Sequence, residues 1–187
     1  MGKGITMWGI EPLPTRWSSA WNEDTYRSTI YSGGAEENRA NPFDFGGGIC
    51  NPNGAMDPGL VYDMNNNDYL NYLCSLGFSN EDVYNTTINS TAAGILCPNE
   101  VPSRLDLNLP SISVPNLKNF VTVRRTVTNV GNVNSLYKLV VKPSKDTAIK
   151  VSPDVLKFNS KTTKISFEVK ITSTHQGRSR FNFGSLA

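Results

Sequence analysis

The sequence predicts a mostly β protein whose C-terminal half, residues 101–187, folds as an antiparallel β-sandwich. Apolar and polar residues alternate strictly over residues 164–172, which is the period of a half-buried strand. The same alternation occurs over 121–128 and 137–142, and turn residues rather than helical patterns separate these runs. Residues 1–100 lack such strands, so we expect a small helical and irregular part before the sandwich.

Composition indicates a folded chain with two parts of different charge. Of the 187 residues, 38% are apolar and 18% are charged, which excludes a disordered tail. Residues 1–100 hold 4 basic and 12 acidic side chains, whereas residues 101–187 hold 14 basic and 4 acidic ones. We expect this attraction to help the two parts dock, although each exposed pair contributes little.

The first part is expected to be irregular over residues 1–45 and rich in turns over 46–54. The sequence Asp57-Pro58-Gly59-Leu60 fits a type II turn, with Pro second and Gly third. A helix is then expected from an N-cap at Asn67 to Gly77, because one apolar face recurs at Tyr69, Leu70, Leu73 and Leu76. A second short helix is expected after Ser79, where Glu81 and Asp82 favour a helix start.

Shorter strands are expected between turn signals in the second part, at 112–114, 149–151, 155–158 and 181–184. Lysines that alternate with apolar residues are expected on the solvated faces. Arg124 and Arg125 point to opposite faces of a regular strand, so one of them must lie inward or find a carboxylate partner.

Several classes of function are excluded. The sequence has no run of 18 apolar residues that could span a membrane, and the six residues from Ile5 to Ile10, which precede Glu11, are too few for an export signal. The basic side chains alternate along strands instead of forming a run, so we expect no nucleic-acid partner. No His or Cys has the close spacing of a zinc site, so we expect no metal and no cofactor.

Two weak signals point to an oxidising secretory environment. Asn85 and Asn89 each begin a glycosylation sequon, and Cys74 and Cys97 form a well-separated pair of cysteines. The absence of an export signal points the other way.

Five motifs are more specific than a fold requires, and together they carry a resemblance. They are Asn51–Asp63, Asp68–Cys74, Asp106–Ile112, Val123–Gly131 and Phe183–Leu186. In this order they resemble the plant subtilisin-like serine proteases, or subtilases. Ala20-Trp21 and residues 41–48 also look like that family, and only about the first eighteen residues do not.

The resemblance implies a secreted serine endopeptidase with an α/β catalytic domain followed by a fibronectin type III-like β-sandwich. Residues 1–18 are then a non-family N-terminus, 19–100 a C-terminal remnant of the catalytic domain, and 101–187 the sandwich. In the family a further stretch after the Phe-Gly-Ser-Leu motif supplies the last strand. We therefore expect a sandwich without that strand, with an unpaired edge open to self-association and with poor solubility.

No catalytic residue can be carried over, because the family's Asp, His and Ser motifs have no counterpart in this sequence. The single histidine, His175, is expected in an exposed loop, and Cys50 is expected to be a packed free thiol. The chain alone is expected to be inactive and structural, with the catalytic domain of a complete enzyme as its partner. The alternative is a free-standing extracellular sandwich that binds protein or glycan.

The resemblance also supports a disulfide between Cys74 and Cys97 and an extracellular location in the apoplast or cell wall. The two cysteines lie 23 positions apart, and closing a loop of that length stabilises a fold by roughly 3 kcal/mol. If the chain is not exported, both thiols stay reduced.

Overall fold

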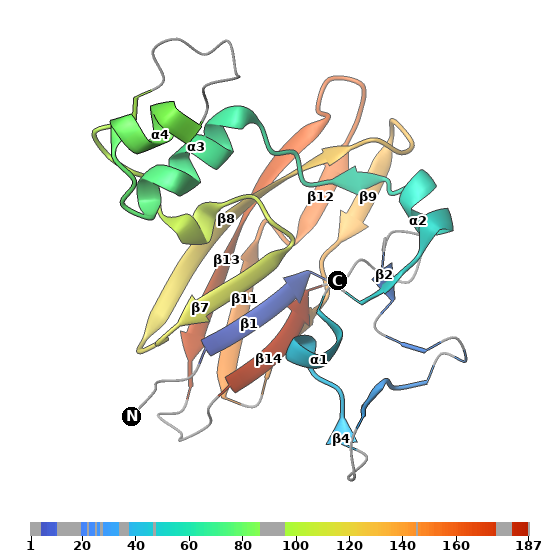
Figure 1. The fold of residues 1–187 in the computed structure, drawn as a ribbon. Coiled ribbons are helices and arrows are strands. Elements are labelled where there is room, and N and C mark those ends of the chain that lie inside the picture. The colour runs from blue at the N-terminus through green and yellow to red at the C-terminus, as the bar shows by residue number, and fades with distance from the viewer. Residues whose placement is uncertain are drawn as a thin grey trace.

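A computed structural model describes residues 5–10, 20–21, 23–24, 26, 28–33, 38–46, 48–86, 96–144, 146–174 and 181–186. Two four-stranded sheets dominate it, and the helices lie around the strands, with α3 and α4 together and α1 and α2 apart from them (Figure 1). The prediction of a mostly β chain with an antiparallel sandwich is confirmed.

The first sheet has the strand order β11-β13-β8-β6, and all its neighbours are antiparallel. Its members are β11 (Thr147–Ser152), β13 (Lys164–Ser173), β8 (Phe120–Asn129) and β6 (Leu60–Val61). The two long strands are the two clearest alternating runs of the sequence. Their register places Val123 opposite Val169 and Val127 opposite Ile165, so apolar side chains share one face.

The second sheet has the order β10-β14-β1-β7 and mixes directions. Its members are β10 (Val141–Lys142), β14 (Phe181–Leu186), β1 (Ile5–Ile10) and β7 (Ser111–Pro115). β1 runs parallel to β14 and antiparallel to β7. The expectation that residues 1–45 are irregular throughout is wrong for β1. β14 therefore pairs with a strand on each side, β10 on one side and β1 on the other.

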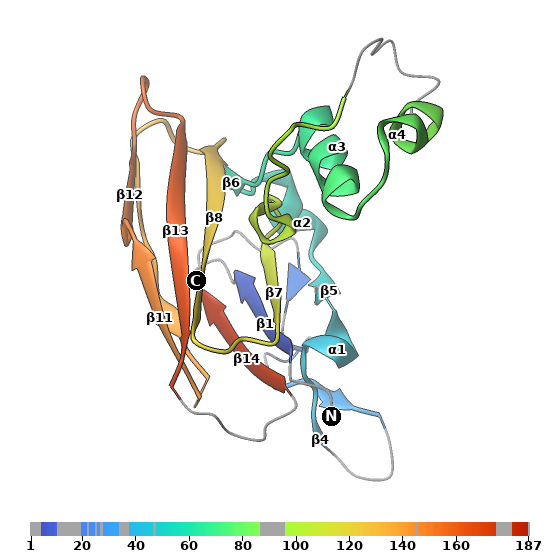
Figure 2. The ribbon, with the colours of Figure 1, turned by 90° about the vertical axis from the view of Figure 1, so that its left-hand side faces the viewer.

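A separate two-stranded sheet pairs β9 (Ser135–Lys138) with β12 (Val155–Phe158) in antiparallel register. The alternating run predicted over 137–142 is therefore divided between β9 and β10. Figure 2 shows the strand layers from the side.

The core lies between the layers, and its buried members among the described side chains come from the second half of the chain, with Leu60 and Tyr62 of the first half packed against them. Its buried members are Ile112, Val114, Val123, Val127, Leu156, Phe158, Phe167, Val169, Ile171 and Leu186. They occupy alternate positions of their strands, which is why the period of two in the sequence located them.

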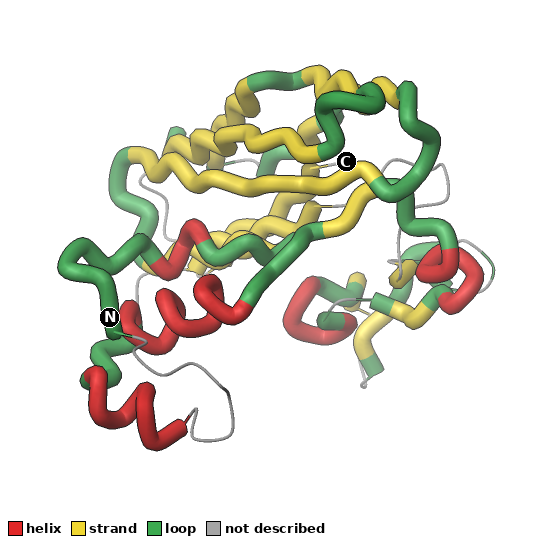
Figure 3. Tube along the Cα trace, turned by 90° about the horizontal axis from the view of Figure 1, so that it is seen from above, coloured by secondary structure: helices red, strands yellow, loops and turns green. Residues whose placement is uncertain are grey.

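The helices gather on one side of the strands (Figure 3). They are α1 (Pro42–Phe45), α2 (Pro52–Met56), α3 (Asn66–Ser75), α4 (Asn80–Thr86) and the 3-10 turn η1 (Arg104–Asp106). Two short antiparallel pairs precede them, β2 (Ala20–Trp21) with β5 (Ile49–Cys50) and β3 (Tyr31–Ser32) with β4 (Asn38–Arg39). Among the described residues, no helix is long and apolar enough to cross a membrane.

The N-cap of α3 is Asn65, two residues before the predicted Asn67. The Asn65 side chain accepts hydrogen bonds from the backbone N–H groups of Asn67 and Asp68, and the Asp68 carboxylate accepts one from the Asn65 N–H. This reciprocal capping box satisfies N–H groups that the first helical turn leaves free.

Candidate functional site

The feature that links the two halves of the chain is the junction between the Asn51–Asp63 motif and the sandwich. Gly59 has a φ of 60°, the conformation that the predicted turn requires at its third position. Its carbonyl accepts hydrogen bonds from the N–H groups of Val130 (2.7 Å) and Gly131 (3.2 Å). The next two residues form β6 and pair with the end of β8. The motif thus supplies a strand to the sandwich sheet.

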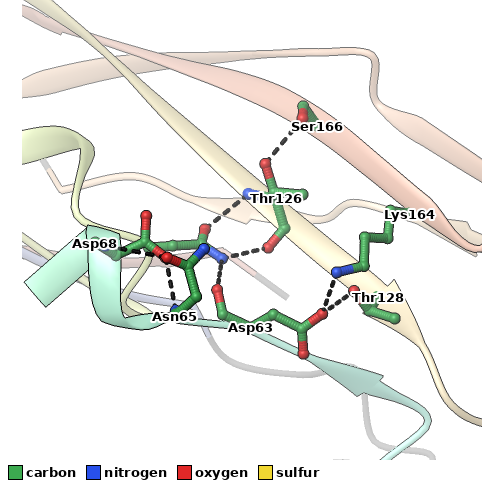
Figure 4. A network of polar contacts seen from close by, with 8 residues as sticks. Asp63, Asn65, Asp68, Thr126, Thr128, Lys164 and Ser166 are labelled. Carbon is green, nitrogen blue, oxygen red and sulfur yellow. Dashed lines mark hydrogen bonds and ion pairs between the residues drawn. The ribbon is translucent and has the colours of Figure 1, made fainter. Parts of the chain in front are cut away.

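Asp63 extends the junction through its side chain (Figure 4). Its carboxylate lies 2.7 Å from the Lys164 ammonium and accepts a 2.6 Å hydrogen bond from the Thr128 hydroxyl. Lys164 and Thr128 are register partners on β13 and β8, so one carboxylate spans two strands. Hydrogen bonds from Lys164 and then Thr128 hold the pKa of Asp63 below its usual value, because both favour the charged form.

We expect this carboxylate to make stability depend on pH at acid values. A folded-state pKa below the unfolded value of about 3.9 adds stability that is complete above that pH and is lost as the pH falls through the folded pKa. Urea unfolding of the wild type and of Asp63→Asn should therefore differ by a constant amount, below about 1 kcal/mol, above pH 5. The difference should shrink below pH 4.

Asp154→Asn is the matched control, since Asp154 is also an exposed carboxylate of the sandwich. A difference between wild type and Asp63→Asn that grows as the pH falls would contradict the assigned role of Asp63.

Asn108 bridges the same junction with its side-chain amide. The amide nitrogen donates to the carbonyls of Asp63 (2.9 Å) and Thr126 (2.8 Å), and the amide oxygen accepts from the Thr126 N–H (2.8 Å). The Thr126 hydroxyl in turn lies 2.8 Å from that of Ser166 on β13. One side chain thus satisfies backbone groups of two segments that are far apart in sequence.

Among the described residues, Arg125 is the one charged side chain that is buried, with 2% of its surface exposed. Its guanidinium donates to four backbone carbonyls, those of Leu105, Leu109, Ser111 and Arg124, at 2.7–3.2 Å. The sequence left open which of Arg124 and Arg125 lies inward, and the structure answers with Arg125. Its hydrogen-bond partners are carbonyls rather than a carboxylate.

The charge of Arg125 lies in an apolar setting beside Tyr62. Burial lowers the pKa of Arg125, and the nearby Tyr62 and Asp106 oppose that shift. Burial likewise raises the pKa of the Tyr62 hydroxyl well above its usual value. Because the donors of Arg125 are directed at carbonyls of its own chain, the arrangement orders the segment around η1 and does not present a cation to a ligand.

The remaining residues singled out in the sequence do not come together in one site. The Sγ atoms of Cys74 and Cys97 are bonded in the structure, with the Cα atoms 5.7 Å apart. Asn85 is exposed on α4, whereas Asn89 and His175 lie outside the described residues. Cys50 belongs to β5, and its side chain is not among those described. Within the described ranges, no group of three or more His, Cys, Asp or Glu could hold a metal.

Sequence reasoning did not find Asn108, Thr126 and Ser166 as a group. Asn108 lies within the Asp106–Ile112 motif, and the family-like order of residues in that motif is the one sequence feature that could have singled it out. For Arg125 the alternation of the strand could have predicted burial, since Arg125 lies two positions from the buried Val123 and Val127 and alternate residues of a strand share a face.

Comparison with known proteins extends this picture. Residues 106–187 match the family model of the fibronectin type-III domain. The chain is 46% identical over 169 residues to the subtilisin-like proteases SBT3.5 and SBT3.10 of Arabidopsis thaliana, and 47% identical over the same length to SBT3.11. These alignments cover 90% of the chain but only 21–22% of each relative, so the chain spans about a fifth of their length. The chain is therefore similar over most of its length to one part of the plant subtilisin-like proteases, and residues 106–187 are similar to a fibronectin type-III domain.

Proposed function

We propose that the chain is a C-terminal portion of an extracellular subtilisin-like serine endopeptidase and that its own residues are structural rather than catalytic. The observation that supports this most strongly is 46% identity to such proteases over nine tenths of the chain. The enzyme activity belongs to the complete protein, since the chain matches only 21% of the length of such a relative.

The catalytic requirement supports the structural part of the proposal. Hydrolysis by a serine protease requires a hydroxyl nucleophile, an imidazole base and a carboxylate that orients it. The sequence has one histidine, His175, and no recognisable copy of the family's three motifs. Asp63, the carboxylate of the junction, is already paired with Lys164 and Thr128.

The surface of the first half supports a partner in the complete enzyme. Among the described residues up to 100, only Cys74 and Val83 are buried apolar side chains, while eleven large apolar side chains are exposed. Tyr26 and Met56 are the most open of these, at 87% and 85%. A segment with this balance has little core of its own, so we propose that it packs against the catalytic domain of the same protein.

The polar junction would hold the first half in place while it packs against the catalytic domain. β6, Asp63 and Asn108 fix the Asn51–Asp63 motif to the sandwich, so the sandwich would brace the motif beside the catalytic domain. Secretion and N-linked glycans at Asn85 and Asn89 are part of the same proposal, and the exposure of Asn85 is compatible with it.

The catalytic claim is tested by treating the purified chain with a serine-directed fluorophosphonate and with a mixture of peptide substrates. We expect neither covalent labelling nor cleavage above the rate of a buffer blank. The matched control is His175→Ala, which should behave identically. Labelling of the wild type that this substitution abolishes would show a working triad in these 187 residues and overturn the proposal.

A further inference from the structure

β1 is the strand that joins the two flanks of the second sheet. Six of its residues pair with β14, from Ile5 opposite Phe181 to Ile10 opposite Leu186. Five of them pair with β7 on the other side. The sheet order places β1 between β14 and β7, which are not neighbours of each other. Within this sheet, backbone pairing therefore connects the two flanking strands only through β1.

The space that β1 fills has the properties of a receptor for an extended peptide. Both flanking strands direct backbone N–H and C=O groups toward it, and leaving such groups unpaired in a sheet is costly. The flanks also carry core residues, since Ile112 and Val114 of β7 and Leu186 of β14 are buried. Backbone ladders on two sides give an inserted strand its affinity, as in other cases of strand addition.

A long stretch of sequence separates the strand that fills the space from the next strand of the two large sheets. Along the sequence, the next member of either large sheet after β1 is β6 at Leu60, about fifty residues later. Figure 1 shows β1 beside β14 and β7, and of the elements that follow it along the chain α1 lies against β14, where the Phe43 ring contacts those of Phe181 and Phe183. β1 has no charged residue that would bind it to one particular neighbour. The same ladder can therefore form with a strand from another molecule.

We propose that the space between β7 and β14 is a strand-binding site and that it takes Ile5–Ile10 from a second copy of the chain. Two copies that exchange this strand form the same ladders as two closed monomers. Which form predominates, closed monomer or exchanged dimer, then depends on the ratio of the chain concentration to the effective concentration of the strand that is tethered to its own chain. This inference uses the sheet topology alone and is independent of the proposed protease relationship.

The test places one cysteine on each of two differently tagged copies, in a Cys50→Ser background. One copy carries Met7→Cys and the other Ser113→Cys, because Met7 and Ser113 are register partners of β1 and β7. Antiparallel partners lie about 4.5–5.5 Å apart at Cα, within the range that a disulfide bridges. The copies are mixed at about 0.5 mM, near the millimolar effective concentration of a flexible tether, in glutathione buffer.

The matched control replaces Ser113→Cys by Ser111→Cys, two residues away on the same exposed face of β7. That diagonal separation is about 7–8 Å, at or beyond the limit of a disulfide. We expect at least tenfold more cross-linked heterodimer on a non-reducing gel from the registered pair than from the control. A second registered pair, Thr6→Cys with Asn182→Cys, reports the same exchange at the β14 edge.

A single chain that carries both Met7→Cys and Ser113→Cys shows whether β1 occupies its own site. If this chain forms its internal cross-link and neither registered pair yields heterodimer above the control, the strand does not exchange and the proposal is wrong. If no cross-link forms in any variant, β1 does not occupy the site at all, and the proposal is equally wrong.

Discussion

Replacing Arg125 by alanine is expected to lower the free energy of unfolding by about 3 kcal/mol or more, measured by urea unfolding at pH 7. The substitution removes a buried guanidinium that donates to four backbone carbonyls. Each buried acceptor left without a donor costs about 1–3 kcal/mol, although water entering the vacated space offsets part of that loss. Arg125→Lys should also destabilise the fold, because an ammonium cannot reproduce the planar fork that reaches carbonyls of separate segments.

The neighbouring Arg124 provides the matched control for this substitution. It is exposed on the same strand, opposite Glu168 in the register of β13. A cross-strand pair of opposite charges contributes about 0.2–1 kcal/mol, so Arg124→Ala should cost no more than that. Equal losses for the two substitutions would show that burial and the four carbonyl bonds are not what makes Arg125 important.

Replacing Phe167 by alanine should cost about 3–5 kcal/mol, the other large effect that we expect. Phe167 lies in the middle of β13, is 2% exposed, and is among the largest fully buried side chains of the described core. Its removal leaves a cavity between tightly paired strands that cannot close around it. Thermal and urea unfolding should both report the loss.

Phe120 is the control of identical chemistry. It is 59% exposed at the start of β8, where its ring lies 4.2 Å from the Lys170 ammonium. Phe120→Ala removes that cation–π contact and little burial, so we expect a cost of about 1 kcal/mol or less. A loss for Phe167→Ala as small as this would mean that the sheets do not enclose a packed core at that position.

The strands that the sequence located well are those whose signal is local. β13 was predicted at 164–172 and spans Lys164–Ser173, because each apolar residue alternates with a polar one within a single run. β14 was predicted at 181–184 and continues to Leu186, where Ser185 and Leu186 are both buried and break the alternation. A strand end buried on both faces has no period of two by which to recognise it.

β1 and the polar junction could not be predicted in the same way. The sequence Ile-Thr-Met-Trp-Gly-Ile has no clean alternation, and its partners lie more than a hundred residues away. The bonds of Asn108 to Asp63 and Thr126 depend on how β6 lines up with β8, and no local pattern encodes that register. The sequence shows which residues β1 and the junction contain, but it does not show which strands or backbone groups they pair with.

The membership of β6 in the sandwich sheet bears on how this protein can be dissected. An excised piece beginning at residue 101 would leave out Leu60 and Val61, the carboxylate of Asp63 and all of β1. Its β8 would then lack one neighbour, and both β7 and β14 would present bare edges. We therefore expect the smallest piece that folds by itself to begin well upstream of Leu60, ahead of residue 106, where the match to the family model begins.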